Sequence, residues 1–177
     1  MRNRQARREE RHGGSDKNRY QMREKLVSIG DDFWIENAQG QKTFKVDGKA
    51  LRVRNTLKFE DAHGNVLVQI QERMFRVKDS MEVEDANGKQ LAMVKKALIS
   101  PLRDRFTVKI KNGPDLKVTG NILDHEYKIY EGRNKVAQQV SKKWFRIRDT
   151  YSVEIEPGQD DIVILAVTAC VEQMAGN

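Results

Sequence analysis

A run of ten residues near the C-terminus, "IVILAVTACV" (162–171), constrains the fold more than any other part of this sequence. Only Thr168 and Cys170 interrupt its plain hydrocarbon side chains, whereas 33% of the whole chain is charged and apolar and polar residues alternate elsewhere. A helix that is apolar on every side has to be buried on every side. The rest of the chain must therefore supply a container for this segment.

The residues that precede the run favour the start of a helix. In "EPGQDD" (156–161), Pro157 and Gly158 end the preceding strand, and Asp160 can cap the helix that follows. We expect a helix over about residues 159–174. Because the run is rich in β-branched residues, a thirteenth strand is the alternative.

Period-2 alternation dominates the middle of the chain. Segments such as "LRVRNTLKF" (51–59) and "RFTVKIK" (105–111) place apolar residues on one face and cationic residues on the other, which is typical of a strand with one buried face. Between such segments lie turns in which glycine or asparagine supplies a positive φ. These turns are "NAQG" (37–40), "DAHGN" (61–65), "DANGK" (85–89), "KNGPD" (111–115) and "EGRN" (131–134). We count about twelve strands, joined largely as antiparallel neighbours.

An internal repeat divides the strands into two related halves. Residues 66–84 align with residues 136–154 at an offset of 70, and "FKVDG" (44–48) aligns with "LKVTG" (116–120) at an offset of 72. The halves cover roughly residues 33–85 and 104–156. Two half-sheets that close on each other leave no exposed edge. We therefore predict an all-β fold, a closed antiparallel β-barrel of about twelve strands around a buried C-terminal α-helix.

These features together resemble one protein family. The two halves, the "FKVDG" motif, the segments "MFRVKD" (74–79) and "WFRIRDTY" (144–151) and the final apolar helix are similar to the LURP-one-related proteins, which belong with the tubby C-terminal and phospholipid scramblase superfamily. The resemblance covers about residues 20–175 and implies a twelve-stranded barrel around a central helix. It implies less about function, because relatives are linked to plant defence, phosphoinositide binding, transcription or membrane lipids. The phosphoinositide-binding motif of tubby and the cysteine-rich segment of scramblases have no match here, so no binding residue carries over.

The net charge of +7 is concentrated at the N-terminus, where the first 25 residues hold nine basic and four acidic side chains. We expect a disordered basic arm over residues 1–18 and a tubby-like barrel domain over residues 19–177. The arm would attract the phosphates of lipid or nucleic acid. The alternative is a solubility tail or a remnant of cloning.

The chain carries one cysteine, Cys170, which cannot form an internal disulfide and is expected to be a buried, inert thiol. This usage is typical of a reducing compartment. No apolar stretch follows the N-terminal arginines, and no segment approaches the roughly 20 apolar residues of a membrane span. We expect a cytoplasmic protein, peripheral at the membrane if it binds lipid.

Residues with catalytic chemistry are sparse. His12, His63 and His125 fall in a tail, a turn and a loop, and no Cys or His pair has metal-ligand spacing. The acids in "GDD" (30–32) and "LDHE" (123–126) could exchange protons or hold a cation, but Asp is also common in turns. We expect no enzyme activity, no cofactor and no metal.

The strongest candidate surface is a basic segment that occurs in both halves, "ERMFRVKD" (72–79) and "SKKWFRIRD" (141–149). If the apolar residues of each segment face the core, the cations and one large apolar side chain face outward. The candidate anion- or lipid-binding residues are Arg76, Lys78, Lys142, Lys143, Trp144, Arg146 and Arg148. The alternative is a solvated strand face paired with acids such as Glu82, Glu84 and Glu154.

These observations favour a non-enzymatic binding or scaffold module that docks on anionic phospholipid through basic strand faces. A second hypothesis is a nucleic-acid-binding or transcription-linked protein that uses the basic arm and the Trp144 face, although no base-reading module is present. A third is a lipid-handling protein with a cavity in the lumen of the barrel.

Overall fold

Twelve antiparallel strands form a closed barrel around one helix in the computed structural model, which describes residues 17–23, 32–47, 56–72, 80–97, 105–142 and 149–175. The strands are β1 (Asn18–Arg23), β2 (Phe33–Asn37), β3 (Lys42–Asp47), β4 (Thr56–Glu60), β5 (Val66–Glu72), β6 (Ser80–Asp85), β7 (Gln90–Ala97), β8 (Arg105–Ile110), β9 (Leu116–Asn121), β10 (Glu126–Glu131), β11 (Lys135–Ser141) and β12 (Thr150–Ile155). Each strand pairs with its neighbours in chain order, and β1 pairs with β12 to close the barrel. The predicted fold class is confirmed.

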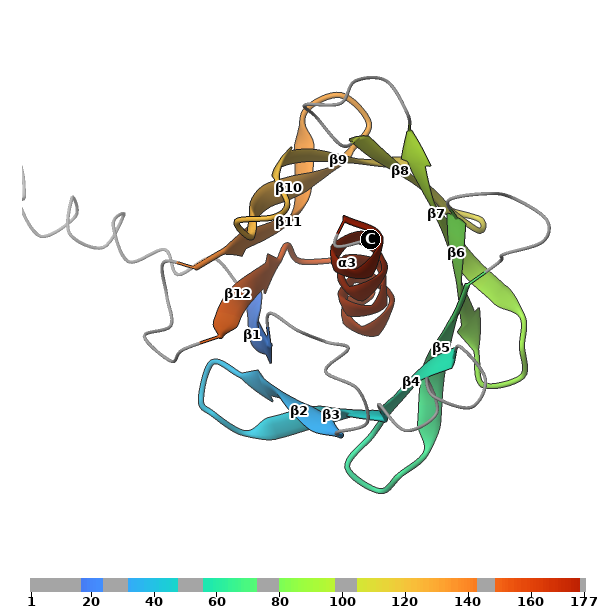
Figure 1. Ribbon diagram of the computed structural model, residues 1–177, viewed down its shortest axis with the longest axis vertical. Helices are drawn as coiled ribbons and strands as arrows, with labels where there is room; N and C mark the ends of the chain where they lie inside the picture. Colours follow the sequence, from blue (N-terminus) through green and yellow to red (C-terminus); the bar gives the residue numbers. More distant parts are fainter. Residues whose placement is uncertain are drawn as a thin grey trace, which may run out of the picture.

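The apolar run is helical and lies inside the barrel. Helix α3 (Asp161–Ala175) passes through the lumen, surrounded by the strands (Figure 1). Every residue from Val163 to Val171 is buried, and Leu165 and Cys170 have no exposed surface. The alternative of a thirteenth strand is therefore wrong. Burial raises the pKa of the Cys170 thiol, as expected for an inert side chain in an apolar core.

The alternating strands and their turns follow the sequence pattern. Leu57, Phe59, Phe106 and Val108 are all buried inside the barrel, whereas Lys109 is exposed. Each of the five predicted turns joins two consecutive strands and holds one residue in the left-handed region of φ. These residues are Gly40 (74°), Gly64 (84°), Gly88 (79°), Asn112 (61°) and Gly132 (63°). A positive φ is accessible to glycine and asparagine at little cost, which explains their places in these turns.

The "LKVTG" motif requires its glycine for a different reason, a close contact with the neighbouring strand. Gly120 has a φ of 137°, and a Cβ atom there would lie 2.6 Å from the Cα atom of Tyr127 on the paired strand β10. No side chain fits at that distance. The motif therefore allows a close approach of β9 and β10 near the end of the hairpin.

Both ends of α3 are fastened to the barrel wall. The side chain of Asp160 accepts a hydrogen bond from the backbone N–H of Val163, which confirms the predicted cap. Asp161 accepts a hydrogen bond of 2.6 Å from the Tyr20 hydroxyl. The last turn contains no basic residue, but Lys96 of β7 donates a hydrogen bond to the carbonyl oxygen of Met174. A cation from the wall thus takes the place of a basic residue in the helix itself.

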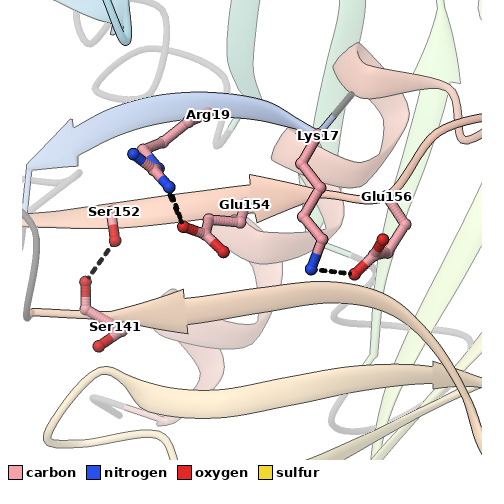
Figure 2. Close-up of polar contacts among 6 residues, drawn as sticks. All are labelled: Lys17, Arg19, Ser141, Ser152, Glu154 and Glu156. Atoms are coloured by element: carbon pink, nitrogen blue, oxygen red, sulfur yellow. Dashed lines mark hydrogen bonds and ion pairs between the residues drawn. The ribbon is translucent and has the colours of Figure 1, made fainter. Parts of the chain in front are cut away.

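Ion pairs across the outer surface strengthen the seam where the N-terminal strand closes the barrel. Lys17 lies 2.7 Å from Glu156, and Arg19 lies 2.6 Å from Glu154 (Figure 2). β1 and β12 are in register over six residue pairs, whereas β1 and β2 are in register over two. Residues 1–16 lie outside the described residues, so the division into an arm and a barrel domain stays a prediction. In the part of the chain that the structure describes, no helix has the length and apolar character needed to cross a membrane.

Candidate functional site

Most of the residues predicted to bind anions or lipid lie outside the described residues. They are Arg76, Lys78, Lys143, Trp144, Arg146 and Arg148. Lys142 is described, and its side chain is exposed just beyond the end of β11. Its backbone N–H donates a hydrogen bond to Glu126 of β10. Of the acids considered as partners for these cations, Glu154 pairs with Arg19 across the seam.

The acids of the two sequence clusters make local structural contacts. Asp32 of "GDD" forms an ion pair of 2.9 Å with Lys45 of β3. In "LDHE", the Asp124 carboxylate accepts a hydrogen bond from the Asn121 side chain, and the Asp124 backbone N–H donates one back to it. Glu126 accepts a hydrogen bond from the Ser141 hydroxyl. These contacts fit the interpretation of the clusters as turn residues. In the described ranges, no group of three or more His, Cys, Asp or Glu side chains could hold a metal ion.

One buried polar cluster was not predicted from the sequence. His125 is the last residue of the turn between β9 and β10, yet its ring is buried and stacks on Tyr151 at 4.6 Å between ring centroids. Its Nδ1 atom lies 2.7 Å from Glu172 in the last turn of α3. Burial, and then the nearby charge of Glu172, raise the pKa of Tyr127 well above its usual value. The cluster ties the β9–β10 turn to the C-terminal end of the helix.

A second surface that the sequence did not single out is formed by outward lysines on four adjacent strands. We call it the lysine face, and it consists of Lys95 on β7, Lys109 on β8, Lys117 on β9 and Lys128 on β10. Each lysine follows or precedes a buried apolar residue of the same strand, which places the lysine on the outside. Lys109 and Lys117 are exposed, and Lys95 and Lys128 are half-buried. Among the described residues, none of the four forms an ion pair.

The strand register shows why these lysines are not neutralised. Lys117 is directly opposite Tyr130 of β10, and Lys128 is directly opposite Thr119 of β9. Both partners are uncharged. Because residues that are directly opposite on one face are the closest neighbours in an antiparallel pair, the two lysines have no carboxylate at the nearest positions.

In the first half of the barrel, the same register places acids directly opposite the equivalent lysines. Lys45 is directly opposite Glu60, and Asp47 is directly opposite Lys58. Lys45 forms ion pairs with Asp32 and, at 3.8 Å, with Glu60. Its hydrogen bond to Asp32 raises the pKa of the Lys45 ammonium. Lys45 is therefore neutralised, whereas its equivalent Lys117 is not. Lys58, the equivalent of Lys128, has an acid directly opposite but forms no ion pair among the described residues.

Comparison with known proteins places this architecture in a family. The model of the LURP-one-related family matches residues 18–172, which include all twelve strands and most of α3. The chain belongs to the LURP-one-related family.

A bacterial relative in the family comparison is the uncharacterised protein YxjI of Bacillus subtilis strain 168. It is 26% identical to this chain over 156 residues, which are 88% of this chain and 93% of YxjI. A similar solved structure is the X-ray structure of a protein from Arabidopsis thaliana, with a TM-score of 0.66 and 18% identity over 91% of this chain and 92% of that one. The family model establishes that the chain is LURP-one-related, and the likeness to the solved structure shows the fold alone.

Proposed function

We propose that this LURP-one-related protein is a non-enzymatic binding module that docks peripherally on anionic phospholipid surfaces in the cytoplasm. The lysine face would make the contact. The observation that supports the proposal is the contrast in register, since Lys117 and Lys128 face Tyr130 and Thr119 where their first-half equivalents face acids. A cation without a carboxylate neighbour keeps its full attraction for an external anion.

The size of this attraction suits reversible membrane binding. A lysine near an anionic membrane surface contributes about 1 kcal/mol, so the four side chains of the lysine face contribute about 4 kcal/mol before ordering costs. The attraction falls with added salt, because exposed charges are screened over about 10 Å at 0.1 M. The basic residues near the N-terminus would add a less specific attraction of the same sign.

The chemistry of the lysine face favours a membrane over a nucleic acid. Base recognition requires an element that enters a groove or a row of aromatic platforms. The outward positions between the lysines hold Thr107, Thr119 and the half-buried Tyr130, on strands that form the wall of the barrel. Such a surface can contact phosphates but has few groups that read or stack on bases.

The filled lumen of the barrel is a further argument for a binding surface on the outside of the strands. Helix α3 occupies the inside of the barrel (Figure 1). It contacts β5, β6, β7 and β12, and its buried residues belong to the same apolar core as those of the strands. An interior lipid would have to displace this buried helix. The proposal therefore places the ligand on the outside of the strands.

The test is flotation with vesicles of phosphatidylcholine that contain 30 mol% phosphatidylglycerol, beside vesicles of phosphatidylcholine alone. The variant K109Q/K117Q/K128Q removes three charges of the lysine face. We expect it to bind the anionic vesicles roughly a hundredfold more weakly than the wild type, because about 3 kcal/mol of attraction is lost. The wild type should not float with the neutral vesicles.

The matched control is K42Q/K58Q/K89Q, which removes the same charge from the first half of the barrel and from the β6–β7 turn that follows it. Lys42 and Lys89 are exposed and Lys58 is half-buried, so the control should remain folded and retain most of the binding. Equal losses in both triple variants would mean that only net charge matters and would refute the lysine face as a site. A mobility-shift assay on duplex DNA at the same salt completes the test. Tighter binding to DNA than to anionic vesicles would favour the nucleic-acid hypothesis instead.

A further inference from the structure

Three lysines of the lysine face are each directly opposite a threonine. Thr107 of β8 lies between Lys95 of β7 and Lys117 of β9, and Thr119 of β9 is in register with Lys128 of β10. The two lysine–threonine pairs that share β9 are Thr107–Lys117 and Thr119–Lys128. Side chains in such positions have Cβ atoms roughly 5 Å apart. Thr107 and Thr119 are exposed, and within the described residues neither hydroxyl takes part in a hydrogen bond.

A lysine and a hydroxyl at this separation complement one phosphate group. The ammonium offers a charge and up to three N–H donors, and the threonine offers an O–H donor to a second oxygen of the same phosphate. Serine and threonine hydroxyls are regular partners of phosphate oxygens in proteins that bind nucleic acid backbones, together with lysine and arginine. The same chemistry applies to a lipid phosphate.

The two lysine–threonine pairs are neighbours on the barrel. The second pair lies one strand across from the first and two residues further along β9. With about 3.4 Å per residue and about 4.8 Å between strands, their centres are about 8 Å apart. Two phosphates can therefore bind without excluding each other, as phosphates of adjacent lipids in one leaflet do.

We propose that the pairs Thr107–Lys117 and Thr119–Lys128 are two subsites for the phosphate groups of neighbouring phospholipids. This inference rests on the proposed function and adds that hydroxyl donors, and not charge alone, fix the lipid. The first half of the barrel supports the assignment. There Trp34 is opposite Lys45 and Asp47 is opposite Lys58, so neither pair combines a lysine with a hydroxyl.

The test replaces the hydroxyls without changing the charge. T107V/T119V keeps the shape of both side chains and suits a strand, whereas T107S/T119S keeps both hydroxyls. We expect the valine variant to bind vesicles with 30 mol% phosphatidylglycerol roughly tenfold more weakly than the wild type, and the serine variant to bind like the wild type. The slope of affinity against salt should be the same for all three proteins, since every lysine is retained.

The possible outcomes separate this inference from the proposed function. Wild-type affinity in T107V/T119V would refute the phosphate subsites, while the lysine face would stand if K109Q/K117Q/K128Q still loses binding. Wild-type affinity in that lysine variant would refute both. An NMR titration with dihexanoyl phosphatidylglycerol gives a second readout. The largest amide shifts should fall on Thr107, Lys117, Thr119 and Lys128, and shifts confined to the first half would also contradict the subsites.

Discussion

The two halves of the barrel share an inner surface and differ on the outside. Val46 is opposite Phe59 in the first half, and Val118 is opposite Ile129 at the equivalent place in the second, and all four side chains are buried. The outward residues lie one position away on each strand. There the lysines are opposite carboxylates in the first half and opposite uncharged side chains in the second. The inner pattern is required to enclose α3, whereas the outer residues carry no such requirement.

The net charge of a strand face therefore depends on the side chains of the neighbouring strands more than on its own residues. Lys45 and Lys117 occupy equivalent positions, but Asp32 and Glu60 neutralise the first, whereas the second is opposite Tyr130 and has no ion pair among the described residues. Two repeats can thus keep one fold while only one of them carries the proposed anion-binding surface.

The largest effect is expected inside, where the two halves depend on the same helix. Leu165→Asp places a carboxylate at a position with no exposed surface, and its desolvation should cost several kcal/mol of folding free energy. We expect insoluble protein or a melting temperature lowered by more than 10 °C in thermal denaturation. Leu165→Met is the control and should cost less than about 1.5 kcal/mol. An unchanged melting temperature in the aspartate variant would place the helix outside the barrel.

The next prediction gives the second half the acids of the first. In T119D/Y130E, each new carboxylate is directly opposite a lysine of the lysine face, and all lysines remain. We expect vesicle binding to weaken roughly thirtyfold, because two lysines are neutralised at about 1 kcal/mol each. T119N/Y130Q is the uncharged control and should bind much more tightly than the acidic variant. Equal binding of the two variants would show that the unneutralised lysines are irrelevant.

The reverse exchange should create a second binding surface. D47T/E60Y gives Lys58 and Lys45 the uncharged partners that their second-half equivalents have. We expect affinity for anionic vesicles to rise about tenfold, less than two full lysines, because Lys45 keeps its ion pair with Asp32. The gain should persist in the K109Q/K117Q/K128Q background. No gain in either background would mean that register alone does not control binding.

The smallest effect is expected in the buried polar cluster, where the two halves of the barrel also differ. Tyr127 in β10 occupies the place that Leu57 has in β4, and both are buried. The folded-state pKa of Tyr127 is raised by burial, so its stabilising contribution is full below its unfolded pKa of about 10 and is lost as the pH rises above it. Chemical denaturation between pH 8 and 11 should show a smaller alkaline loss in Tyr127→Phe than in the wild type. Identical alkaline losses of unfolding free energy in the two proteins would contradict a raised pKa of Tyr127 in the folded state.

Much of the fold could be predicted because its determinants are local. The alternation in "RFTVKIK" (105–111) and the glycine of turns such as "DANGK" (85–89) depend on residues next to each other in sequence. The run 162–171 could be assigned to the interior because no surface suits it. Closure of the barrel followed from the repeat, since two half-sheets require partners for their edges.

The surface site could not be predicted in the same way. Lys117 and Lys128 look like ordinary outward residues until the register shows which side chains are opposite them. The signal that could have found them is the repeat itself, because the offsets of 72 and 70 align Asp47 with Thr119 and Glu60 with Tyr130. The contact of His125 with Glu172 joins a turn to a helix end far along the chain, and no local pattern indicates it.

The central claim is that the second half of the barrel, and not the first, touches the membrane. Acetylation of lysines followed by mass spectrometry, with and without phosphatidylglycerol vesicles, tests it directly because each lysine is read separately. We predict that vesicles protect Lys109, Lys117 and Lys128 at least several-fold, while Lys42 and Lys89 react at unchanged rates. Equal protection of both halves, or protection confined to Lys42 and Lys89, would contradict the account.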